Sequence, residues 1–202
     1  LSVDNNISAI EDKNLPLVSD SSTVQYAGTI TTNGLESHGL VVKGTGTLTN
    51  ISGKTVSSIV NGDGSVALYN EGTVNLNDGG VFKSLGNGGA AVFSVGTTNI
   101  KGANTYEVGT NGIGFYANGG RITLDGNGGT STIKIGAGSI FSYIDGTSTP
   151  PAAINFNNGT FNVSLDTKAI GLIYKGAGTG IITPASLQTY MNHNYARLTN
   201  VN

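Results

Sequence analysis

The feature that most constrains the fold is a short phrase that recurs along the chain. It is a glycine followed by three residues, polar at the first and third positions and mostly apolar at the second. Its six copies are Gly28–Thr31, Gly46–Thr49, Gly72–Asn75, Gly96–Asn99, Gly120–Thr123 and Gly159–Asn162. Successive glycines lie 18, 26, 24, 24 and 39 residues apart. The nearly constant interval in the middle of the chain indicates a solenoid, in which each repeat is one turn resting on its neighbours.

Each phrase has the alternation of a β-strand with one buried face. In the third copy, Val74 and Leu76 alternate with Thr73 and Asn75. A period of two sends one set of side chains into a core and the other toward water. The glycine ahead of the strand permits a bend that a Cβ would obstruct.

Two further strand-like runs accompany each phrase. Those just before the glycine are Leu40–Val42, Val66–Tyr69, Ala90–Phe93, Gly114–Tyr116 and Ala152–Ile154. Those that follow are Ser57–Val60, Val81–Leu85, Thr105–Val108 and Ser131–Ile135. Three strands per turn, joined by Asn-Gly and Asp-Gly corners, predict an all-β fold. We expect a right-handed parallel β-helix, a three-sided solenoid with about 24 residues per turn.

A β-sandwich is the alternative architecture, because it also has many short strands and turns. Sandwich strands rarely repeat one phrase at one interval, so the solenoid is favoured. The interval of 39 residues then requires an extended turn, with residues 139–144 adding apolar surface and residues 147–151 forming a loop. The period also predicts a register: Lys83 beside Glu107, and Phe82 above Tyr106.

The chain divides into three predicted parts. Residues 1–22 form a starting or capping segment, residues 23–182 the β-helix, and residues 183–202 a helical cap or connector. Thr183 and Pro184 are typical of a helix start. Apolar residues at helical spacing follow, namely Leu187, Met191, Tyr195 and Leu198. They predict a short C-terminal helix.

Composition excludes several classes of protein. The chain is 37% hydrophobic with a net charge of -2, which argues against disorder. Its 10 basic residues are scattered, so no nucleic-acid footprint is expected. The absence of cysteine excludes disulfides and thiolate metal sites. No apolar run is long enough to cross a bilayer, and Leu1 is preceded by no leader, so we expect a fragment that does not itself insert into membranes.

The segments Val66–Leu76, Ala90–Ile100 and Gly112–Leu124 resemble the passenger domains of type V autotransporters, with the stretch Asn111–Gly120 most similar. The flavour is that of the large fusobacterial adhesins and the vacuolating-toxin-like passengers. The resemblance extends over about residues 26–180. It implies an extracellular protein on the bacterial surface, anchored in the outer membrane through a barrel absent from this sequence. It also implies adhesion to a host or bacterial cell-surface protein or glycan, with the rest of the passenger at both ends.

The residues do not predict catalysis. Acids on the coil fall at different offsets from the repeated glycine: Glu36, Asp63, Glu71, Asp78, Glu107, Asp125, Asp145 and Asp166. A glycosidase needs two carboxylates held close together. His38 and His193 are predicted to be solvated surface side chains. Asn61–Gly64 is interpreted as a turn and not a calcium loop, and Gly86–Gly89 and Gly126–Gly129 as corners and not phosphate cradles. We therefore expect no enzyme, cofactor or metal site.

The candidate binding residues form an outer polar column that begins near Thr31 and contains Thr49, Asn75, Asn99, Thr123 and Asn162. Ice binding is a further hypothesis for such a column, but asparagine alternates with threonine in it and Arg121 interrupts its neighbour. The favoured function is a surface adhesin. A stalk without its own ligand, a toxin passenger and a polysaccharide-active enzyme stay open as alternatives.

Overall fold

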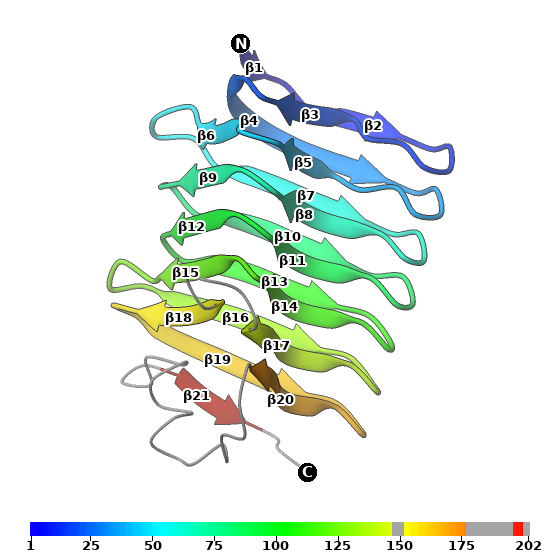
Figure 1. The fold of residues 1–202 in the computed structure, drawn as a ribbon, viewed down its shortest axis with the longest axis vertical. Coiled ribbons are helices and arrows are strands. Elements are labelled where there is room, and N and C mark those ends of the chain that lie inside the picture. Colours follow the sequence, from blue (N-terminus) through cyan, green and yellow to red (C-terminus); the bar gives the residue numbers. More distant parts are fainter. Residues whose placement is uncertain (147–151, 177–195, 200–202) are drawn as a thin grey trace.

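The computed structural model describes residues 1–146, 152–176 and 196–199, and it shows a parallel β-solenoid (Figure 1). All strand pairs in these ranges are parallel. Thr97 pairs with Thr73 in one direction and with Arg121 in the other, each 24 residues away. The predicted three-sided coil of about 24 residues per turn is confirmed.

The strands form three faces, which we name A, B and C. Face A contains β1 (Ser2–Asp4), the first part of β4 (Thr23–Thr32), β6 (Thr47–Asn50), β9 (Thr73–Leu76), β12 (Thr97–Lys101), β15 (Arg121–Asp125) and β18 (Ala153–Asn157). Face B contains β2 (Ile7–Ala9), the second part of β4, β7 (Val56–Val60), β10 (Gly80–Ser84), β13 (Asn104–Val108), β16 (Thr130–Ile135), β19 (Thr160–Leu165) and β21 (Ala196–Thr199). Face C contains β3 (Leu17–Asp20), β5 (Leu40–Lys43), β8 (Val66–Asn70), β11 (Ala90–Ser94), β14 (Ile113–Asn118), β17 (Ile140–Gly146) and β20 (Ile170–Gly176).

The predicted register is confirmed at β10 and β13. Lys83 pairs with Glu107, and its Nζ lies 2.8 Å from the Glu107 carboxylate. On the opposite side of the same strands, the rings of Phe82 and Tyr106 stack with their centroids 5.7 Å apart. Both rings are fully buried, so these strands send one side chain in two into the core.

The first and last copies of the glycine phrase were assigned to the wrong face. Thr29 and Thr31 belong to the part of β4 that pairs with β7, and Asn162 pairs with Thr132 of β16, so both copies lie on face B. Thr123 pairs instead with Asn155. The error arose because a glycine followed by alternating residues occurs at more than one corner of the turn.

The long interval after Gly120 has a different structure from the one predicted. Residues 140–146 are an ordinary strand of face C, β17, in register with β14. Residues 153–157, predicted in part as a face C run, form β18 on face A. The extra residues therefore enter at the corner between β17 and β18. The predicted loop at residues 147–151 lies outside the described residues.

At the ends, residues 1–22 supply β1, β2 and β3, which pair with the next turn on all three faces. The predicted C-terminal helix falls mainly on residues 183–195, which lie outside the described residues. Within the described part of that segment, Ala196–Thr199 is a strand, β21, which pairs with β19. No helix occurs among the residues that the structure describes.

Stacked glycines form two of the corners, and they explain the recurring phrase. A Cβ built on Gly72 would overlap the carbonyl oxygen of Gly46, and one on Gly96 would overlap that of Gly72. Gly34, Gly62, Gly86, Gly109 and Gly136 form an equivalent column at the corner that leads into face C. Apart from the terminal loops, the glycines of these columns have ordinary backbone angles. Glycine is required there by the close approach of the turn below.

We expect Gly96→Ala to lower the free energy of unfolding by about 1–3 kcal/mol, because the backbone of two turns must move apart. Gly171→Ala is the matched control, since its Cβ position has no neighbouring atom within 4 Å. The control should change stability by less than about 0.5 kcal/mol. Equilibrium urea unfolding followed by tyrosine fluorescence measures both variants. Equal unfolding midpoints for the two would contradict the role given to the corner.

Candidate binding surface

The outer side of face A carries the predicted polar column, with a corrected membership. Thr49, Asn75, Asn99 and Thr123 pair consecutively, as expected. The column continues to Gln25 at one end and to Asn155 at the other, so Thr31 and Asn162 are not part of it.

The amides of this column bond to each other. The Asn99 side-chain amide donates a hydrogen bond to Asn75 Oδ1 at 2.9 Å. In the adjacent column, Arg121 pairs with Thr97 and then with Ala153, which ends the run of threonines. Part of the hydrogen-bonding capacity of face A is therefore used internally, and its role in binding stays a prediction.

The outer side of face B is charged. Lys83, Glu107 and Lys134 alternate in sign on three consecutive strands. A shallow depression of about 470 Å³ lies beside them and is also lined by Ser164 and Asp166. Its wall holds carboxylates and an ammonium group but is open to solvent. Among the described residues, no cluster of three or more His, Asp or Glu side chains is arranged to hold a metal ion.

The outer side of face C is aromatic. Tyr69, Phe93, Tyr116 and Tyr143 occupy consecutive rungs in direct register. Their ring centroids are separated by 5.0, 5.0 and 4.7 Å along the column. His38 extends the stack, because its ring lies parallel to that of Tyr69 at 5.8 Å. We call these five side chains the aromatic ladder.

A second apolar column runs beside the aromatic ladder. Its members are Val66, Ala90, Ile113, Ile140 and Ile170. Neither column belongs to the hydrophobic core, and Ile170 is 45% exposed. Face C is thus apolar on its outside as well as its inside, whereas faces A and B are polar outside. Exposed apolar patches on this scale commonly mark interaction sites.

Polar side chains border the aromatic ladder on its other flank. They form a column that we call the charged edge: Asp20, Lys43, Glu71, Val95, Asn118, Asp145 and Lys175. The Tyr69 hydroxyl donates a hydrogen bond to Glu71 at 2.8 Å, and Lys175 lies 3.6 Å from Asp145.

The phenols of the aromatic ladder are hydrogen-bond donors at neutral pH. Burial raises the pKa of Tyr69, and its hydrogen bond to Glu71 and the negative charge there raise it further. Burial also raises the pKa of Tyr116, with Tyr143 and Asp145 adding to the effect. Each rung therefore combines an apolar ring with a protonated hydroxyl, a combination favoured at binding interfaces.

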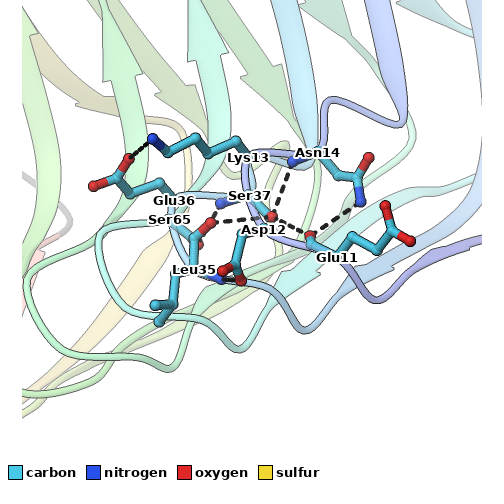
Figure 2. A network of polar contacts seen from close by, with 8 residues as sticks. All are labelled: Glu11, Asp12, Lys13, Asn14, Leu35, Glu36, Ser37 and Ser65. Atoms are coloured by element: carbon cyan, nitrogen blue, oxygen red, sulfur yellow. Dashed lines mark hydrogen bonds and ion pairs between the residues drawn. The ribbon is translucent and has the colours of Figure 1, made fainter.

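The corner that carries His38 is fixed by a polar network (Figure 2). The Ser37 N–H donates to Ser65 Oγ at 2.9 Å, and the Ser37 hydroxyl donates to the Glu11 carbonyl at 2.9 Å. Asp12 accepts a hydrogen bond from the Leu35 N–H at 2.8 Å. These bonds join three successive turns, so the corner holds His38 in place at the end of the aromatic ladder.

His38 was predicted to be a solvated side chain, and the structure places it differently. It is half-buried, and its Nδ1 accepts a hydrogen bond from the Val66 N–H at 3.1 Å. Burial lowers its pKa below 6.5, Glu36 partly opposes this shift and Lys43 adds to it. The neutral imidazole is the form that fits. His193 lies outside the described residues.

The aromatic ladder was not predicted from the sequence, although a signal for it exists. The apolar runs ending in Tyr69, Phe93 and Tyr116 were interpreted as core strands throughout. A strict period of two places Leu68 and Val92 inside and the following aromatic residues outside. Aromatic residues at the same offset in four successive turns were the available evidence.

No protein-family model, no curated protein and no solved structure matches this chain. In the described ranges, none of the elements is a helix long and apolar enough to cross a membrane. The candidate binding surface therefore rests on its own geometry.

The pKa of His38 predicts a pH-dependent stability. The unfolded chain binds a proton at His38 more readily than the folded chain does, so protonation favours unfolding. The stabilising contribution is complete above about pH 6.5 and declines as the pH falls below that value toward the lowered pKa. We expect the free energy of unfolding to decrease between about pH 7.5 and about pH 5.5.

The variant His38→Phe keeps a ring beside Tyr69 but cannot be protonated, so it should show a smaller decrease over the same interval. Urea unfolding at several pH values measures the difference between the two proteins. Parallel pH profiles for the native chain and the variant would contradict the assignment.

Proposed function

We propose that the chain is a binding and display module of a bacterial surface adhesin, which contacts its target through face C. The observation that carries this proposal is the aromatic ladder on the outside of a parallel sheet. Such sheets are usually covered on both faces, and an uncovered apolar face favours association with another molecule. The residue types agree, because Tyr and Phe are enriched where proteins bind partners.

The target we propose is a host or bacterial cell-surface protein or glycan. Rings with donor hydroxyls at each rung suit the apolar surfaces of either partner, and the charged edge supplies carboxylates and ammonium groups next to them. Glu71 and Asp145 lie within one side chain of the ladder, on the same strands or the corners that follow them. Hydrogen bonding beside apolar contact is what gives such surfaces specificity.

The similarity to autotransporter passengers supports an extracellular location on the bacterial surface. A solenoid without cysteine suits export through an outer membrane, since no disulfide can form before the passage. In this proposal the rest of the passenger and its membrane anchor lie outside the given sequence.

The rival functions make less use of the structure. A stalk without a ligand has no need of an apolar outer face, which raises the risk of aggregation. A polysaccharide-active enzyme needs two carboxylates at a fixed short separation. The acids of the coil are spread over all three faces and their corners, from Glu71 beside face C to Glu107 on face B.

Binding of the purified chain to cells and to a glycan array tests the proposal. We expect the double variant Phe93→Ser, Tyr116→Ser to lower target binding at least about tenfold, because truncating central aromatic contacts commonly costs 2 kcal/mol or more. Asn99→Ser on face A is the matched control and should leave binding unchanged. Equal loss in both variants, or no binding of the native chain to any cell or glycan, would contradict an adhesive role for face C.

A further inference from the structure

The two outer columns of face C have a symmetry that faces A and B lack. The ladder column has seven rungs in register: Val18, Val41, Tyr69, Phe93, Tyr116, Tyr143 and Ile173. Phe93 is the middle rung. Counted outward from it in both directions, tyrosine lies opposite tyrosine, and a β-branched residue lies at each end. The column therefore has nearly the same composition in both directions.

The charged edge has the same centre and is complementary about it. Val95 is the middle rung and is 43% exposed. Two rungs away on either side are Lys43 and Asp145, and three rungs away are Asp20 and Lys175. Reversing the column therefore places each of these charges opposite one of the other sign.

We propose that face C binds a second copy of this chain, with the two solenoids antiparallel and related by a two-fold axis along β11. Such an axis lies in the plane between two packed faces and parallel to the strands. It keeps each column opposite its own copy while reversing the order of the rungs, as an isologous interface requires. Phe93 and Val95 then meet their own counterparts, Lys43 meets Asp145, and Asp20 meets Lys175.

The charged edge also selects this register over its neighbours. Moving the centre by one rung toward the C-terminus would set Glu71 against Asp145 and Lys43 against Lys175. Moving it by one rung the other way would set Asp20 against Asp145. A parallel arrangement would set Lys43 against Lys43. Like charges brought together at an interface disfavour these alternatives.

The outer apolar column agrees with the same axis. Ala90 lies on β11, and Val66 and Ile113 flank it on the two neighbouring strands. Reversal therefore brings Val66 opposite Ile113, again apolar against apolar. This inference uses the face assigned above to adhesion, and it names the partner as another copy of the same protein, so that contact between cells would be homotypic.

A single cysteine on the axis tests the geometry directly, because the native chain contains none. Val95→Cys should form a disulfide-linked dimer under mild oxidation, since the two sulfur atoms meet at the axis. Thr97→Cys is the matched control: it is also exposed and only two residues away, but it lies on face A. Non-reducing electrophoresis should show a dimer for the first variant and mainly monomer for the second. Monomer for both, or equal dimer for both, would overturn the proposal.

Charge reversal supplies an independent test in solution. Lys43→Asp alone and Asp145→Lys alone should each weaken self-association at least about tenfold, because each places like charges together twice in the dimer. An equimolar mixture of the two variants should restore it, since both contacts are then between opposite charges. Sedimentation velocity measures the association, and circular dichroism shows that each variant is folded. No recovery in the mixture of folded variants would overturn the antiparallel pairing.

The two proposals fail in different ways. If the native chain is monomeric at all concentrations tested but still binds cells or glycans, self-pairing is overturned and the adhesin proposal stands. If the chain forms the predicted dimer but binds no cells and no glycan, self-pairing stands and the adhesin proposal falls.

Discussion

The contact on which this structure depends is between backbones, at the corners where one turn rests on the next. The carbonyl oxygen of Gly72 occupies the space where a Cβ of Gly96 would be, and Gly46 and Gly72 have the same relation. Parallel strands separated by the usual spacing need corners that stack as closely as the strands do. Glycine meets this condition because it has no side chain. The repeated glycine is therefore a requirement of stacking, and the strands it introduces are aligned as a result.

Close stacking turns the surface into columns. A residue type that recurs at one position of the turn becomes a continuous row, as Asn75 and Asn99 do on face A and Tyr69 and Phe93 do on face C. The same alignment operates inside, where the rings of Phe82 and Tyr106 stack. A binding surface on such a scaffold is a row of similar rungs, and its specificity has to come from how adjacent rows combine.

The period, the three strands per turn and the pairing of Lys83 with Glu107 could all be predicted from the sequence, because they depend on local alternation and one interval. Two results could not. Corners vary in length, so Ala90 pairs with Ile113 after 23 residues and Arg121 with Ala153 after 32, and a fixed interval misplaced Asn162. The aromatic ladder was missed because the apolar runs on face C contain inward and outward side chains alike, and hydrophobicity alone does not distinguish them.

An apolar row by itself has no preferred register against a partner. A ring that slips by one rung meets another ring at nearly the same distance, so aromatic contact gives affinity without alignment. Charges next to the row remove this degeneracy, since a slip of one rung changes attraction into repulsion. The unequal sequence along the charged edge, with Lys43 and Asp145 on either side of Val95, is what a repetitive solenoid needs in order to bind in one position.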